Sequence, residues 1–262
     1  MPDQQIERWR DPQEVIRLAE PYYMKGLPYR NINHGIGVGL HGAQIALEAQ
    51  KRGVTDIDPD IVAAEGICHD ISSHLVPGKD HKKFETREAY SAEIGLWVVG
   101  NLGMPNVLKP DFVRDIKSTH LPVQPTTNNG RALKRGDLWN LQGFPVQLLG
   151  TTFALFKEKL LLEKGEESVE ALAENRSNTR RDFGSFAATN YEPLREALTP
   201  DLTIGDEPTN KSGHCEFVYK ARQGIELLRP AVLERVLPSL MPAIVAYQPP
   251  AYRFPAKRQA AA

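Results

Sequence analysis

The sequence predicts an all-α protein, and three observations support this prediction. Helix start and stop signals recur along the chain, apolar residues repeat at helical spacing, and the alternating pattern of strands hardly appears. With 262 residues the chain can bury a hydrophobic core without disulfides. We therefore expect helices joined by loops that hold most of the glycine and proline.

The first expected helix covers 11–24. It opens with the letters DPQE, which provide an N-cap, a proline in the first turn and a capping-box glutamate. The second covers 35–51, ends before Gly53, and carries Ile36, Leu40, Ala43 and Leu47 on one stripe. The third covers 61–72 after the cap-plus-proline start at 58–59, and it is apolar nearly all round, which is typical of a central helix.

The later part of the chain predicts more helices and then an extended tail. We expect helices over 86–101, 110–119, 131–142 and 145–164, one or two over 168–188, and a long one over 212–237. The segment 238–262 contains five prolines and no helical periodicity, so it is expected to be extended. The predicted organisation is a helical domain over 1–165, additional helices over 166–237 packed on it, and the Pro-rich tail.

Composition narrows the class of partner. The chain has 32 basic and 33 acidic residues, a formal net charge of -1, so a small-molecule partner is a better expectation than nucleic acid or a membrane. Cys68 and Cys215 form no disulfide framework, and the amino terminus has no apolar signal core. We expect a cytoplasmic protein. The oligomeric state stays open, a homo-oligomer included.

The doublet His69-Asp70 is the most informative feature, because it ends the apolar run 61–71. Burying a polar side chain without a partner costs about 2 to 7 kcal/mol, and burying an ion costs more. Such a doublet is therefore usually tied to a metal or to a hydrogen-bond network. His34 upstream and Asp137 downstream are the expected remaining members of one site.

Two imidazoles and two carboxylates suit a divalent cation. The carboxylates offset its charge, and the imidazoles favour Mn, Fe, Co, Ni or Zn over calcium, with Mg kept among the candidates. Four protein ligands leave open positions on an octahedral ion, where water becomes a nucleophile and a phosphoryl oxygen is polarised. The predicted ligands are His34, His69, Asp70 and Asp137, and the predicted chemistry is hydrolytic.

This order of residues resembles the HD superfamily of metal-dependent phosphohydrolases, whose ligands are a histidine, a His-Asp doublet and a distant aspartate. The run YRNINH at 29–34 is similar to the family's Tyr-His-Asn-x-x-His motif, with Arg30 in place of the first histidine. The run GDL at 136–138 is similar to its Ala-Asp-Leu motif. The resemblance covers about residues 25 to 145. It implies an HD-domain helical bundle that hydrolyses a phosphoester, most plausibly of a nucleotide.

Other residues are expected to assist. Asp70 is a candidate proton acceptor, and His120 is a candidate general acid or ligand of a second metal, with a surface loop histidine as the alternative. Arg30, Lys134 and Arg135 adjoin ligands in the sequence and are the expected anion-binding residues. Glu88 either bonds metal-bound water or is an ordinary helix-face glutamate.

A competing motif is rejected on its context. The letters GVGLHG at 37–42 match the dinucleotide pattern G-x-G-x-x-G, and aspartates follow about twenty residues later. However, the preceding segment 29–34 is polar, which does not fit a buried strand, and no alternation of strands and helices follows. We expect these glycines to allow close helix packing instead.

Two rivals to the phosphohydrolase stay open. Some HD-fold proteins hold two irons and react with dioxygen. Because His74, His81 and His120 are further histidines, a di-iron oxygenase remains an alternative. The other rival is a non-catalytic module that binds a metal or ligand. The tasks of residues 165 to 262 are not predicted.

Overall fold

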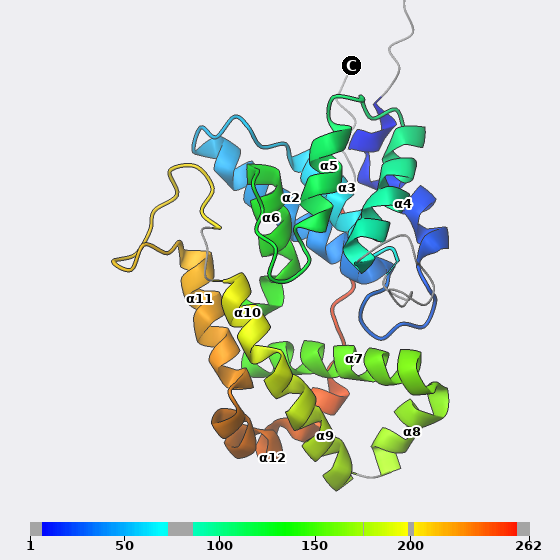
Figure 1. Ribbon diagram of the computed structural model, residues 1–262, viewed down its shortest axis with the longest axis vertical. Coiled ribbons are helices and arrows are strands. Elements are labelled where there is room, and N and C mark those ends of the chain that lie inside the picture. Colours follow the sequence, from blue (N-terminus) through cyan, green and yellow to red (C-terminus); the bar gives the residue numbers. More distant parts are fainter. Residues whose placement is uncertain (1–6, 73–85, 175, 199–201, 256–262) are drawn as a thin grey trace, which may run out of the picture.

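The computed structural model describes residues 7–72, 86–174, 176–198 and 202–255, and within these ranges its regular elements are helices. Figure 1 shows an upper group of helices that includes α2 to α6 and a lower group formed by α7 to α12. The predicted all-α class is confirmed. Nowhere in these ranges is a helix both long and apolar enough to span a membrane.

The helices have the following bounds. The upper group is α1 Pro12–Ala19, α2 Ile32–Lys51, α3 Pro59–Cys68, α4 Arg87–Asn101, α5 Lys109–Lys117 and α6 Asn128–Asp137. The lower group is α7 Pro145–Lys164, α8 Glu166–Glu174, α9 Arg176–Thr189, α10 Tyr191–Ala197, α11 Glu216–Ile225 and α12 Pro230–Ala246. Short 3-10 turns follow α1 at Glu20–Tyr22, α6 at Trp139–Gln142 and α11 at Glu226–Leu228.

The predicted helix starts are confirmed where capping residues define them. Asp11 accepts a hydrogen bond from the N–H of Gln13, and Asp58 accepts one from the N–H of Asp60. Each cap precedes a proline in the first turn, where the missing N–H costs nothing. Helix α7 has the predicted bounds, and it ends at Gly165 with a φ of 85°.

Helices α2 and α3 pack at backbone contact distance. Gly35, Gly39 and Gly42 lie four and three residues apart, so they share the face of α2 that meets α3. A Cβ atom on Gly39 would lie 2.6 Å from the carbonyl oxygen of Ala63, and one on Gly66 of α3 would lie 2.3 Å from the nitrogen of Gly39. The expectation that the glycines allow close helix packing is confirmed.

The predicted apolar stripe of α2 was wrong at three of its four positions, and only Ala43 is buried as expected. Ile36 and Leu40 are only partly buried and Leu47 is 47% exposed, whereas Val38, Ala46 and the glycines are buried. A search for repeating apolar side chains does not count glycine as a buried residue. It therefore misses the face of α2 that packs on α3 through its glycines.

The carboxy-terminal segments differ from prediction in three ways. The expected long helix over 212–237 is divided by the turn at 226–228 into α11 and α12, and α10 was not expected. Helix α12 continues through Pro238 and Pro242 to Ala246, because Leu237 and Ile244 are buried on its inner side. The extended tail therefore begins at Tyr247 rather than at 238.

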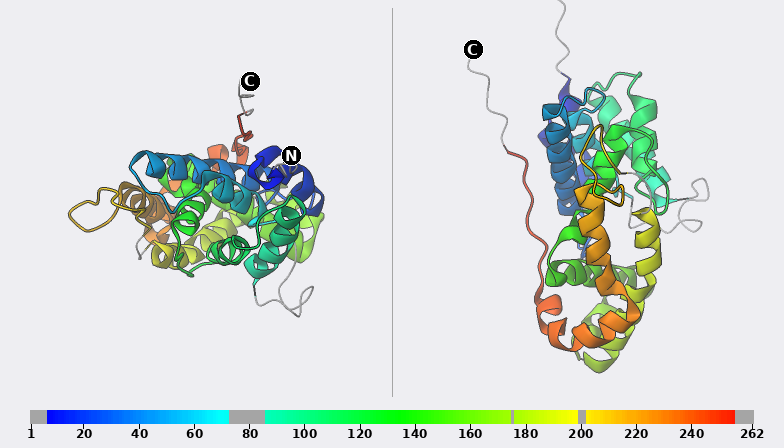
Figure 2. Two further views of the ribbon diagram at one scale, coloured as in Figure 1. Left: turned by 90° about the horizontal axis from the view of Figure 1, so that it is seen from above. Right: turned by 90° about the vertical axis from the view of Figure 1, so that its left-hand side faces the viewer.

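This tail crosses the outside of α2, as the right-hand view of Figure 2 shows. The side chain of Asn33 donates a hydrogen bond to the carbonyl of Pro250 and accepts one from the N–H of Tyr252. The ring of Tyr252 occupies the space where Gly37 has no side chain. Gly37 thus lies on a different face of α2 from the glycines that contact α3, and the chain's own tail packs on this face.

The contact between α2 and α3 predicts a sharp effect of one methyl group. Gly66→Ala should lower the free energy of unfolding by about 1 to 3 kcal/mol, because its Cβ meets the backbone of Gly39, which cannot move aside. Gly100→Ala in α4 is the matched control. Its Cβ would meet only the end of Lys109 at 3.8 Å, so stability should be unchanged or up to about 1 kcal/mol higher. Urea unfolding measures both, and equal effects would contradict this account.

Candidate metal centre

The structure brings together the four residues expected as ligands. His34 lies in the first turn of α2, His69 and Asp70 directly follow α3, and Asp137 is the last residue of α6. The Nε2 atom of His34 lies 3.4 Å from an oxygen of Asp70 and 3.4 Å from one of Asp137. The Nε2 atom of His69 lies 3.4 and 3.5 Å from the same two oxygens.

Local structure aims both imidazoles at this point. The ring nitrogen Nδ1 of His69 lies 2.8 Å from the carbonyl oxygen of Gly66, which places a proton on Nδ1 and turns Nε2 toward the two carboxylates. The Nε2 atoms of His34 and His69 are buried, and each faces the two carboxylates at 3.4 to 3.5 Å, which is ion-pair distance but longer than a strong hydrogen bond. Burial by itself would lower the pKa of both histidines, but the two carboxylates outweigh it and raise the pKa of each.

The distances fit donors around one ion. Donor atoms bound at about 2.0 to 2.2 Å lie about 3 to 3.5 Å apart when their bonds meet at about 90 to 110 degrees. The four nitrogen-to-oxygen distances fall in this range. Ligand atoms of His34, His69 and Asp70 all lie within 4.8 Å of one another, whereas Asp137 falls outside this group and is near it through its contacts with the two histidines. These side chains can therefore hold a metal ion.

Electrostatics keep the carboxylates ionised. Burial by itself would raise the pKa of Asp70, but the two histidines and Arg30 outweigh it and hold this pKa well below its usual value. The pKa of Asp137 is also lowered, because His34 and His69 outweigh its burial. Negative charge is thus concentrated beside the two imidazoles. A cation at this point would take the place of imidazole protons.

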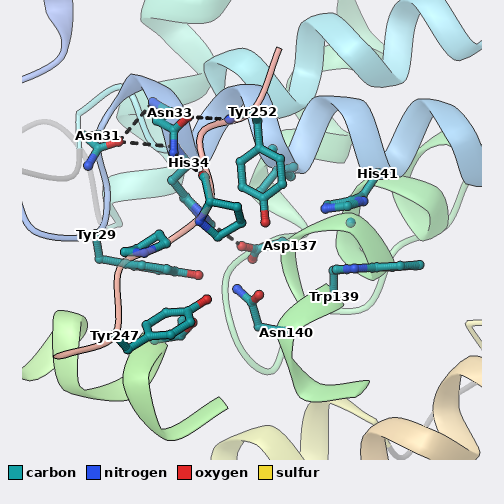
Figure 3. A pocket seen from close by; sticks show the side chains of 16 residues that line it. Tyr29, Asn31, Asn33, His34, His41, Asp137, Trp139, Asn140, Tyr247 and Tyr252 are labelled. Carbon is teal, nitrogen blue, oxygen red and sulfur yellow. Dashed lines mark hydrogen bonds and ion pairs between the residues drawn. The ribbon is translucent and has the colours of Figure 1, made fainter. Parts of the chain in front are cut away.

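The cluster lies between two cavities. His69, Asp70 and Asp137 border a cavity of about 560 Å³, which we call the main cavity. On the other side, His34 and Asp137 border a small cavity of about 30 Å³ beneath the tail. In Figure 3, aromatic rings and amides surround this small cavity, among them those of Tyr29, Tyr247, Tyr252, Trp139 and Asn140.

His120 and Glu88 form a pair on the wall of the main cavity. The Nδ1 atom of His120 lies 3.0 Å from an oxygen of Glu88, and the side chain of His120 is 43% exposed. With Nδ1 bonded to the carboxylate, Nε2 is the nitrogen left to exchange a proton. The structure thus places His120 on the wall of the cavity that three of the predicted ligands also border, where it pairs with Glu88.

Arg30 lines the same cavity and is held by a residue that the sequence did not reveal. Its Nε atom lies 3.7 Å from an oxygen of Asp70. Glu158 of α7, which is 1% exposed, accepts hydrogen bonds from the N–H groups of Tyr29 and Arg30 at 3.2 and 2.7 Å. Nothing in the sequence around Glu158 distinguishes it from Glu163, the exposed glutamate of the same helix. Arg87, at the start of α4, was also missed and lines this cavity.

Lys134 and Arg135, expected to bind an anion, are not brought to the cluster. Lys134 is fully buried and donates to the carbonyl oxygens of Ser118 and Val123. Arg135 forms a two-point ion pair with Glu207. Adjacency to Asp137 in the sequence misled here for two reasons. Arg135, two residues earlier on the helix, points to another face, and the ammonium of Lys134 is held by the two backbone carbonyls. His74 and His81 lie outside the described residues.

Comparison with protein-family models, curated proteins and solved structures finds no match for this chain.

Glu158 predicts a test of how α7 supports the site. Glu158→Met has a similar size but no acceptor, so the buried N–H groups of Tyr29 and Arg30 lose their partner. The free energy of unfolding should fall by about 1 to 3 kcal/mol. Glu163→Met, at an exposed position of the same helix, should change it by less than about 0.5 kcal/mol. If both variants unfold at the same urea concentration as the parent, Glu158 has no such role.

Proposed function

We propose that the protein is an HD-type, metal-dependent phosphohydrolase that cleaves a phosphoester of a small molecule. One observation carries the proposal. Two buried Nε2 atoms face the same two carboxylate oxygens at 3.4 to 3.5 Å, and three of these four residues border a cavity that two guanidinium groups also line. The resemblance of 25–145 to the HD superfamily supports it.

His34, His69, Asp70 and Asp137 would hold the cation. When bound, a divalent cation of the Mn, Fe, Co, Ni, Zn or Mg group supplies an acidified water and polarises a phosphoryl oxygen. The ionised carboxyl of Asp70 is the acceptor that we propose for a proton of the attacking water. The tautomer of His69 is fixed by Gly66, so its Nε2 needs no reorganisation to act as a ligand.

Arg30 and Arg87 are the proposed phosphate-binding residues. Both line the main cavity beside Asp70. Burial lowers the pKa of the Arg87 guanidinium, and the positive charge of Arg30 lowers it further. An anion between the two groups would relieve that repulsion, and guanidinium groups bind phosphate oxygens in pairs. Arg87 replaces Lys134 and Arg135 in this role.

His120 is the proposed general acid. Its Nε2 would give a proton to the leaving oxygen of the alcohol as the phosphorus–oxygen bond breaks. Glu88 positions the ring through its contact with Nδ1. The proton is restored from solvent, because the side chain is partly exposed.

Asp70→Ala tests the metal and the activity together. After incubation with Mn, Fe or Zn and gel filtration, the parent protein should retain metal by mass spectrometry, and Asp70→Ala should retain at least tenfold less, because one charged ligand is gone. Phosphate release from a panel of nucleotides, cyclic nucleotides and simple phosphoesters should disappear with it. Glu88→Gln, which keeps the four ligands, should keep the metal.

Three results would contradict the proposal in different ways. An unchanged metal content in Asp70→Ala would remove the assigned ligands. Oxygen consumption by an iron-loaded protein without phosphate release would favour the di-iron oxygenase. Bound metal without turnover of any member of the panel would favour a binding module.

His120→Gln tests the general acid. With an alkyl phosphate, kcat should fall by at least about 100-fold, whereas with 4-nitrophenyl phosphate the loss should be much smaller, because nitrophenolate leaves without a proton. Metal content should be unchanged. An equal loss of kcat on both substrates would show that His120 serves another role.

A further inference from the structure

From the walls of the main cavity we infer that the substrate is a phosphomonoester of an apolar, aliphatic alcohol rather than a nucleotide. The inference rests on the proposed function and concerns the group that the phosphate is attached to. It differs from the nucleotide expected from the sequence, and it uses the apolar side chains of the cavity wall, several of which come from α7 and α10.

The cavity is lined by two kinds of side chain. His69, Asp70, Asp137, Arg30, Arg87 and the His120–Glu88 pair are the charged and titratable ones. Six leucines line the cavity as well: Leu121, Leu138, Leu141, Leu148, Leu155 and Leu194. On α7, Leu148, Thr151, Thr152 and Leu155 follow the spacing of a single helix face, so this face of α7 is turned to the cavity. An anionic head group and an apolar chain match these two kinds of side chain.

A nucleobase finds few of its usual partners among the described residues. Proteins bind such rings by stacking on aromatic side chains and by hydrogen bonds to the ring edges. Tyr29 is the one Phe, Tyr or Trp of the described lining, and its ring already packs on His34 with centroids 4.3 Å apart. Asn140 and Asn190 are the amides of that lining. The leucines offer no edge contacts.

The small cavity offers the aromatic rings but not the space. It borders the cluster beneath the tail, and its volume of about 30 Å³ suits one or two water molecules. A purine cannot enter it unless the tail moves away from Asn33. The organic group of the substrate therefore has to lie in the main cavity, against the leucines.

A series of n-alkyl phosphates from ethyl to octyl tests the inference with the metal-loaded parent protein. Each methylene buried against leucine should raise kcat/KM by about three- to fourfold until the cavity is filled. Hexyl phosphate should exceed nucleoside 5′-monophosphates. A flat series, or faster hydrolysis of the nucleotides, would overturn the inference while leaving the phosphohydrolase in place. Bound metal with no hydrolysis of any phosphoester would overturn the proposed function itself.

A variant locates the effect in the cavity. Leu155→Asn changes a partly exposed leucine of the lining and should reduce kcat/KM for hexyl phosphate by about tenfold or more, with ethyl phosphate unaffected. The ratio of the two substrates within one variant does not depend on how much protein folds. Leu162→Asn, at a partly exposed position of α7 away from this lining, should leave the ratio unchanged. Equal ratios in Leu155→Asn and the parent would remove the leucine wall from substrate recognition.

Discussion

The close packing of α2 on α3 is the constraint on which the rest of the structure depends. His34 belongs to one helix and the His69-Asp70 doublet follows the other, so their separation is set by how near the two backbones approach. Gly39 and Gly66 meet where neither position has room for a side chain. Gly66 has a second task, because its carbonyl oxygen fixes the ring of His69. The packing and the orientation of a candidate ligand thus depend on the same short segment.

The lower group of helices completes the cavity rather than the cluster. Helix α7 contributes Glu158, which holds the segment that carries Arg30, and it turns Leu148 and Leu155 to the main cavity. Helix α10 adds Leu194, and the tail after α12 covers the opposite side of His34. The upper helices would therefore supply the reactive groups, and the lower helices the surface that selects a substrate.

Helix starts, the all-α class and the proximity of the four residues expected as ligands could be predicted from the sequence. Asp11 and Asp58 cap helices because capping depends only on near neighbours. The predictions that were wrong concerned the direction of side chains, and the residues that were missed make contacts with distant parts of the chain. Lys134 and Arg135 adjoin Asp137 in the chain but point to Ser118 and Glu207. Glu158 meets Arg30 across 128 positions, a pairing that no local pattern contains.

The helical path through Pro238 and Pro242 illustrates the same limit. Two prolines within one helix indicate an extended segment by any local rule, yet the apolar side of α12 is buried against α7 and α9. Tertiary packing outweighed the lost backbone hydrogen bonds. A sequence pattern indicates only the conformation that a segment prefers locally. The burial of its apolar side chains against other helices, which can override that preference, is seen only in the folded structure.

Anomalous diffraction from crystals soaked in Mn²⁺ tests the central claim most directly. We expect one manganese peak at about 2.0 to 2.3 Å from both Nε2 atoms of His34 and His69 and from an oxygen each of Asp70 and Asp137. Diffraction to ordinary resolution that shows these four side chains in place without a peak between them, or a peak held by other residues, would contradict it.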